Sequence, residues 1–226
     1  MKLYGVMILL ALMTATTDIA KDAPAKSVRF VYLVSADRPA SKEYIRAIEH
    51  AGRDVQQWYA GQLEGRSFRL HSPVVDVVLS DKDAMWFTTH PNGKNEASWG
   101  FYNALDEIKR LLNAQPGSDG YVWVIYSDGP GSSGRARPCF AYLPEDDLLG
   151  LLGQHHTQKD PKRWIGGLAH ELGHALGLPH PKDTKKHAHA IMWAGFYGRY
   201  PATCYLTEED KKILLANPFI VPAEQK

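Results

Sequence analysis

One short segment, HELGHALGLPH, contains three histidines and a glutamate and constrains the local fold strongly. Residues four apart lie on the same face of an α-helix, so His170 and His174 can direct their imidazoles at one point. His180 follows six residues after His174 and cannot share that face. Gly177 favours the left-handed conformation that is common just after a helix end, so the chain can turn there and bring His180 back. The spacing therefore predicts a helix, a glycine turn and three converging imidazoles.

Three converging imidazoles are a suitable ligand set for zinc, which prefers tetrahedral coordination with nitrogen at about 2.0–2.1 Å. The predicted ligands His170, His174 and His180 leave the fourth position open, as in catalytic zinc sites. A water in such a position has its pKa lowered to about 7. Glu171 lies about 100° around the helix from His170, where it can reach this water and act as general base. We therefore predict one catalytic zinc; core or surface histidines without a metal are the alternative.

The N-terminus has the pattern of a secretory signal peptide. Lys2 is followed by a mostly apolar stretch over residues 3–13 and then by small and hydroxyl residues. The apolar stretch is shorter than the roughly 20 residues of a membrane span. We predict a signal peptide over 1–20, a short linker over 21–26 and a single catalytic domain over 27–226. This organisation predicts a secreted, periplasmic or extracellular protein without stable membrane insertion after cleavage. A buried N-terminal strand or helix and an uncleaved anchor are the alternatives.

The two cysteines of the chain, Cys139 and Cys204, are candidates for one disulfide. In an oxidising compartment a single pair of cysteines favours a bridge, which here would close a loop around the whole histidine segment. Two unpaired thiols are the alternative.

Length and charge limit the classes of function. A chain of 226 residues is long enough for one domain with a substantial core. The net charge is +1, and no run of lysine or arginine stands out. A nucleic-acid partner is therefore not expected, because it would need a basic patch.

The hydrophobic pattern alternates between strands and helices. Apolar runs predict strands at 27–34, 67–79, 120–128 and 139–144, and helical spacing begins near Ser41 and returns at 95–113, 160–176 and 206–218. A glycine- and proline-rich stretch at 129–138 reads as a loop. This order predicts one α/β domain.

With these residues in view, the chain resembles the metzincins, a clan of zinc endopeptidases. They share the pattern HExxHxxGxxH, followed by a methionine-containing turn below the metal. The resemblance implies that His170, His174 and His180 bind zinc and that Glu171 is the general base. It also implies that HAIMWAGFYGRY is the Met-turn, with Met192 as its methionine. Considered alone, Met192 would be an ordinary core methionine.

The resemblance also implies a fold and a mode of substrate binding. The expected fold is an α+β zincin domain with a twisted mixed sheet, two long helices above an extended cleft, and a C-terminal helix after the Met-turn. A peptide or protein substrate would lie extended in the cleft against an edge strand. CFAYLP at 139–144, with the loop before it, is the candidate for that edge. A plain core strand is the alternative for this segment.

Tyrosines and further histidines near the motif need separate interpretation. In some metzincins a tyrosine two residues after the methionine approaches the zinc, but Ala194 stands there in this chain. Tyr197 and Tyr200 are the candidates to replace it, with an exposed or core tyrosine as the alternative for each. Four more histidines are expected to be exposed loop residues rather than ligands: His155, His156, His187 and His189.

These features together predict a secreted zinc-dependent endopeptidase that hydrolyses peptide bonds with Glu171 as general base. One alternative is a catalytically silent zinc-binding or protein-interaction domain, although such a module has no need of Glu171. Another is a zinc hydrolase of a non-protein amide, such as a cell-wall crosslink. The sequence does not decide a calcium requirement or the oligomeric state.

Overall fold

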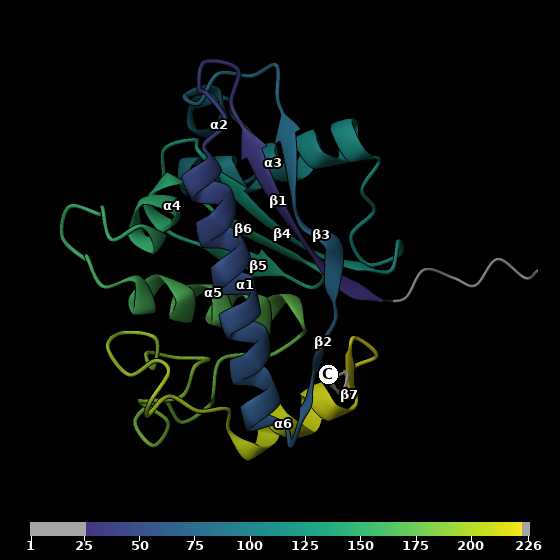
Figure 1. The fold of residues 1–226 in the computed structure, drawn as a ribbon, viewed down its shortest axis with the longest axis vertical. Coiled ribbons are helices and arrows are strands. Elements are labelled where there is room, and N and C mark those ends of the chain that lie inside the picture. Colours follow the sequence, from purple (N-terminus) through teal and green to yellow (C-terminus); the bar gives the residue numbers. More distant parts are fainter. Residues whose placement is uncertain (1–25, 223–226) are drawn as a thin grey trace, which may run out of the picture.

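A computed structural model describes residues 26–222, so the predicted signal peptide and most of the predicted linker lie outside the described residues. The centre of the fold is a five-stranded sheet with the order β3-β1-β4-β6-β5 (Figure 1). Its strands are β1 (Ser27–Val34), β3 (Leu70–Leu79), β4 (Tyr121–Ser127), β5 (Arg135–Arg137) and β6 (Phe140–Leu143). Strand β5 runs antiparallel to β6, while the other neighbours are parallel. The sheet is therefore mixed, as the resemblance implies.

Helices cover both faces of this sheet. One face carries α1 (Lys42–Gln62), α4 (Glu145–Leu151) and α5 (Pro161–Ala175), and the other carries α2 (Trp86–Thr89) and α3 (Glu96–Leu112). In β1, Phe30 and Tyr32 point to the α1 side, and Val31 and Leu33 point to the α3 side. All four side chains are buried, which explains why β1 reads as a continuous apolar run rather than an alternating one.

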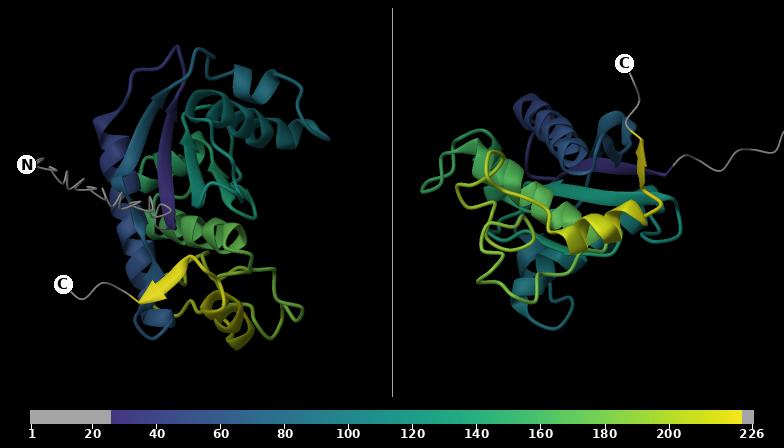
Figure 2. Two further views of the ribbon diagram at one scale, coloured as in Figure 1. Left: turned by 90° about the vertical axis from the view of Figure 1, so that its right-hand side faces the viewer. Right: turned by 90° about the horizontal axis from the view of Figure 1, so that it is seen from below.

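A smaller C-terminal part lies on the other side of α5 from the sheet (Figure 2). From residue 177 to residue 207 the chain consists mostly of turns, and α6 (Glu208–Leu215) and β7 (Ile220–Pro222) follow. Strand β7 pairs antiparallel with β2 (Arg66–Phe68), which continues from the end of α1. Helix α5 is thus held between the main sheet and the C-terminal part.

The predicted helix starts agree with the observed caps. The Ser41 hydroxyl accepts a hydrogen bond from the backbone N–H of Tyr44 at the start of α1. Thr207 and Asp210 form a capping box at the start of α6. In the part of the chain that the structure describes, no helix has the length and apolar character needed to cross a membrane.

Two predicted features are corrected. The single strand predicted at 67–79 is two strands, because β2 turns away to pair with β7 while β3 joins the main sheet. The predicted disulfide is wrong, since Cys139 and Cys204 are both free. Cys139 precedes β6, where its backbone N–H donates to the carbonyl of Ala175, whereas Cys204 is buried in the C-terminal part. Both residues pack against the core cluster on the α1 side of the sheet, and no bridge joins them.

Candidate metal centre and active site

The histidine segment forms the end of α5 and the turn that follows. The helix begins with Asp160 as N-cap and a proline in its first turn, as predicted. It ends in a Schellman motif, in which the N–H of Gly177 donates to the carbonyl of His174 and the N–H of Leu178 donates to that of Gly173. Gly177 has a φ of +96°, the left-handed conformation that the sequence predicts. The turn reverses the chain and returns His180 to the helix.

The three imidazoles converge at one point. Nε2 of His174 lies 3.2 Å from Nε2 of His170 and 3.0 Å from Nε2 of His180. Two nitrogens bound to one zinc at about 2.05 Å in tetrahedral geometry would be about 3.3 Å apart. The observed spacing therefore fits three ligands of one catalytic zinc. Among residues 26–222, this is the cluster of potential ligands close enough to share an ion.

The second nitrogen of two of these rings is fixed by a backbone carbonyl. Nδ1 of His170 lies 2.7 Å from the Ile191 oxygen, and Nδ1 of His174 lies 2.8 Å from the Leu178 oxygen. A carbonyl oxygen only accepts hydrogen bonds, so each Nδ1 donates and each Nε2 presents its lone pair to the metal. Burial lowers the pKa of His170 to about 4 and also lowers the pKa of His174, so both rings are neutral at pH 7.

Glu171 lies beside the metal centre and against the edge strand. A Cβ atom on Gly134, the residue before β5, would come within 3.0 Å of its Cγ, so a glycine allows the close approach. Burial raises the pKa of Glu171 to about 7, although Arg135 and Arg163 act in the opposite direction. A carboxyl group with a pKa near neutrality can both take up and release a proton at physiological pH, as a general base that later acts as an acid must.

Met192 lies directly below α5. Its side chain is fully buried, and its Sδ packs against Gly173, where a Cβ atom would come within 2.4 Å of the sulfur. The residue before it, Ile191, supplies the carbonyl that orients His170. This segment therefore packs against α5 at Gly173 and orients the imidazole of His170.

The predicted edge, CFAYLP with the loop before it, is confirmed for the loop and wrong for CFAYLP itself. Strand β6, which contains most of CFAYLP, lies between β4 and β5 and is fully buried. The edge strand on this side of the sheet is β5, which lies in the loop before CFAYLP, and β3 forms the opposite edge. The sequence did not predict this strand, because the glycines and prolines at 129–138 are typical of a loop.

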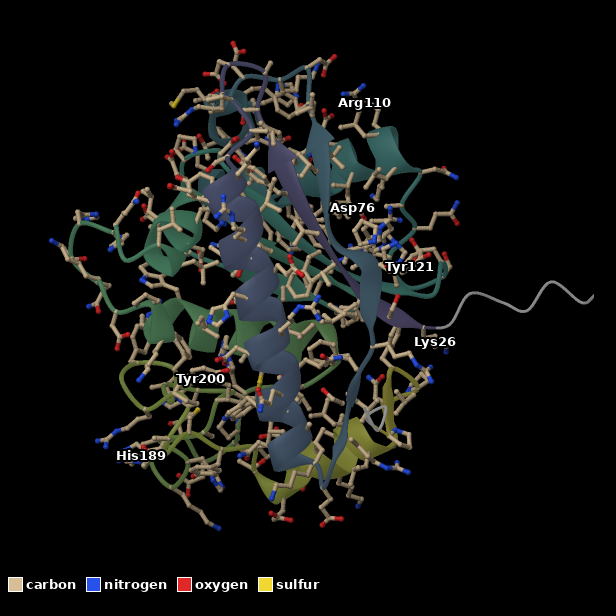
Figure 3. All side chains as sticks on the ribbon, viewed as in Figure 1. Lys26, Asp76, Arg110, Tyr121, His189 and Tyr200 are labelled. Atoms are coloured by element: carbon tan, nitrogen blue, oxygen red, sulfur yellow. The ribbon has the colours of Figure 1, made fainter. Side chains whose placement is uncertain are left out.

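The two candidate tyrosines occupy different environments. Tyr197 is exposed and its ring stacks over the Arg163 guanidinium at 4.5 Å, while Tyr200 is buried and donates a hydrogen bond to Asp54 of α1. Figure 3 shows Tyr200 close to α1 and His189 at the outer rim of the C-terminal part. Tyr200 is therefore a core residue, one of the predicted alternatives.

The four further histidines are not part of the cluster that could bind a metal. His155 is buried rather than exposed, which corrects the prediction. Its Nδ1 accepts hydrogen bonds from the backbone of Thr157 and Gln158, and its ring packs against Trp164. His155 thus fixes the turn before α5.

A pocket of about 150 Å³ opens next to the metal centre, and two of its polar residues, Asp147 and Arg163, were not predicted from the sequence. It is lined by His170 and Glu171 together with Asp147 of α4 and Arg163 of α5. Arg163 and Glu171 are two helical turns apart and share a face of α5, a spacing that could have pointed to Arg163. Nothing in the sequence around Asp147 marked it, because its place depends on how α4 packs on α5.

No protein-family model and no curated protein matches the chain. Solved structures do match. Wild-type OgpA from Akkermansia muciniphila is 26% identical and covers 89% of this chain with a TM-score of 0.63. A catalytically inactive OgpA in complex with an O-glycopeptide substrate, glycodrosocin, is 25% identical and covers 96% of this chain with a TM-score of 0.61.

The chain spans 64% of the first of these OgpA chains and 68% of the second. Archaemetzincin from Methanopyrus kandleri is also similar, at 16% identity over 85% of this chain and 96% of its own, but its TM-score of 0.44 is too low to bear on function. The protein therefore has the fold of a zinc metallopeptidase, with three histidines that fit one catalytic zinc.

Proposed function

We propose that this protein is a secreted zinc-dependent endopeptidase of the metzincin type. The observation that carries the proposal is the convergence of three imidazoles beside Glu171, at the edge of the sheet formed by β5. The zinc ligands would be His170, His174 and His180, with Met192 in the turn below them. A silent binding module would not need a base of this pKa at that place.

Each part of the site would have its own role in peptide hydrolysis. Zinc, when bound, polarises the substrate carbonyl and lowers the pKa of water. Glu171 takes a proton from the attacking water, whose oxygen forms the new bond to the carbonyl carbon. Glu171 then delivers this proton to the amide nitrogen as the C–N bond breaks, so that a carboxyl group and an amine are released. Unpaired backbone groups of β5 would hold the substrate extended, with little dependence on its sequence.

For the substrate, we propose an O-glycopeptide. The support is the likeness to OgpA, whose inactive form is seen with an O-glycopeptide substrate and which matches 96% of this chain. Unmodified peptides and a non-protein amide are the competing substrate classes. Cleavage assays that compare an O-glycopeptide with the same peptide without the sugar, and with a non-protein amide, distinguish these three substrate classes.

The test combines zinc analysis with cleavage assays. Purified protein should hold one zinc per chain and should cut O-glycopeptides internally, with the activity lost on adding a chelator. Glu171→Gln should keep the zinc and lose roughly 10²- to 10⁴-fold in kcat. Glu209→Gln, the same change at an exposed position on α6, should cleave as the parent does.

Each outcome has a clear meaning. Full activity of Glu171→Gln would overturn the assignment of the base. Stoichiometric zinc without cleavage of any peptide would favour the binding module or a non-protein amide. Absence of zinc would overturn the metal site itself.

Secretion is tested separately. When the full chain is expressed in a secreting host, we expect the exported protein to begin near residue 21. Retention of residues 1–20 on cell-associated protein would contradict the signal peptide.

A further inference from the structure

The three zinc ligands are not held in the same way. Nδ1 of His170 and Nδ1 of His174 each donate to a backbone carbonyl, at 2.7 Å and 2.8 Å. Within residues 26–222, Nδ1 of His180 has no such acceptor, and the residue is exposed. A histidine that binds a metal almost always donates its other ring N–H, and this bond fixes the orientation of the ring. The orientation of His180 therefore has to come from another kind of contact.

The backbone around His180 is restricted, but rotation of its ring is not. Pro179 and Pro181 flank the histidine. A proline fixes its own φ angle and also limits the residue before it to extended conformations, so the Cα–Cβ bond of His180 has a narrow range of directions. The side-chain torsions of His180 remain free to turn, because neither proline acts on them. Only a contact with the ring itself can stop this rotation.

The ring of Trp193 supplies such a contact. Its centre lies 5.6 Å from the centre of the His180 ring, and the two ring planes meet at 80°. This is the edge-to-face arrangement that aromatic pairs favour. Among the described residues, the other rings packed on His180 are those of the ligands His170 and His174. Trp193 is thus the ring contact of His180 that comes from outside the ligand set.

The backbone that carries Trp193 is closely fixed. Its N–H and that of Gly195 both donate to the carbonyl of Ala190. A Cβ atom on Gly195 would come within 2.7 Å of the Ala190 oxygen, so the turn is tight. The same turn contains Ile191, whose carbonyl orients His170. One rigid turn therefore presents an orienting group to two of the three ligands.

Packing in the core does not explain Trp193. It is 41% exposed, although tryptophan is a large residue that is highly buried on average. The two residues before it, Ile191 and Met192, are fully buried. The chain thus places a large aromatic side chain at the surface, directly against a metal ligand, where it gains little from burial. This position indicates a role at the metal centre.

We propose that Trp193 is the positioning residue of His180. Its ring keeps Nε2 of His180 next to Nε2 of His174, where the ligands converge. It thereby replaces the backbone carbonyl that orients each of the other two imidazoles. Without this ring, His180 rotates away more often, and the site then offers only two ligands. The inference rests on the zinc site of the proposed function and makes no assumption about the substrate.

Zinc affinity is the direct measurement, because it needs no turnover. The dissociation constant for zinc is determined by competition with a chelating indicator. We expect Trp193→Ala to bind zinc about 10-fold more weakly than the parent, while Trp193→Phe keeps an aromatic face and should stay within about threefold. Trp86→Ala is the matched control. It removes a tryptophan that stacks on His90, a histidine outside the metal cluster, and should bind zinc as the parent does.

A double-mutant cycle shows whether the effect passes through His180. In protein that carries His180→Ala, the further change Trp193→Ala should alter zinc affinity by less than about twofold. The visible absorption of cobalt(II)-loaded protein reports the coordination of the metal. In Trp193→Ala it should move toward that of His180→Ala, and in Trp193→Phe it should not. The Tm of the zinc-free proteins should be the same, which separates this effect from a general loss of folding.

The outcomes for this inference and for the proposed function are distinct. Unchanged zinc affinity in Trp193→Ala would overturn the inference, as would an equal loss of affinity with and without His180. A raised KM with unchanged zinc affinity would also overturn it and would assign Trp193 to the substrate. All three results leave the peptidase function intact. If the parent binds zinc but cuts no peptide, the peptidase function fails, and the zinc affinities of the variants still decide the role of Trp193.

Discussion

The buried carboxyl group of Asp147 should make the folded protein less stable as pH rises. Burial raises its pKa to about 8, against the attraction of Arg163 and with a further rise from Glu171. Between its ordinary pKa of 3.8 and this value, the folded protein holds a proton that the unfolded chain has released. The free energy of unfolding therefore falls as pH increases through this range, by up to about 1.4 kcal/mol per pH unit.

Asp147→Asn removes this titration while keeping the shape of the side chain. The full shift gives an upper limit of about 4 kcal/mol for the stability gained at pH 7, and about 2 kcal/mol at pH 5. Relaxation around a buried group reduces such figures, so we expect a gain of about 1–3 kcal/mol at pH 7. The gain should be clearly smaller at pH 5.

Urea unfolding of the zinc-loaded protein at pH 5 and pH 7 measures this difference. Asp83→Asn, the same change at an exposed position, is the matched control, and its stability should follow that of the parent at both pH values. A loss of stability in Asp147→Asn at pH 7 would refute the reasoning, as would a gain of equal size at both pH values. In either case Asp147 would be well solvated or paired in the folded protein.

Three further results are expected. His174→Ala should abolish stoichiometric zinc binding, and an unchanged zinc content would contradict the ligand assignment. In calorimetry, a chelator should lower the Tm of the parent protein but not that of this variant. Burial opposes ionisation of Glu107, but its hydrogen bonds to Arg110 and Ser80 hold its pKa below the ordinary range. The stability that these bonds give the folded protein is therefore lost as pH falls through that range. Glu107→Gln should therefore lose about 1–3 kcal/mol at pH 7 and less at pH 4, measured by urea unfolding; equal losses at both pH values would argue against the ion pair. Because both cysteines are free, a reductant should leave the Tm unchanged and two thiols should be alkylated after unfolding; a mass that shows a bridge would contradict this.

The metal centre could be predicted from the sequence because its information is local. The spacing of His170 and His174 is a property of any α-helix, and Gly177 marks the turn that returns His180. The main strands were also predictable, since burial on both faces of the sheet requires continuous apolar runs such as 27–34.

The features that were missed depend on contacts between distant segments. Strand β5 has three residues in a glycine-rich loop, and only its pairing with β6 makes it a strand. Asp147 reaches the pocket because α4 packs on α5. The order of residues along the sequence does not predict such a contact between two separate helices. The expected disulfide failed for the same reason, since the positions of Cys139 and Cys204 in the sequence do not fix how the fold places their side chains, and both are free.

The pairing of β2 with β7 has a consequence for the order of folding. Phe68 pairs with Ile220 in this small sheet, so the contact closes a very long stretch of chain. Contacts of this kind form late, because the entropy of closing the loop must be overcome first. On the ribosome, the pairing that ties the C-terminal part to the end of α1 cannot form before residue 222 has emerged. A nascent chain can thus carry the helical histidine pair before the C-terminal part beneath α5 is anchored to the end of α1.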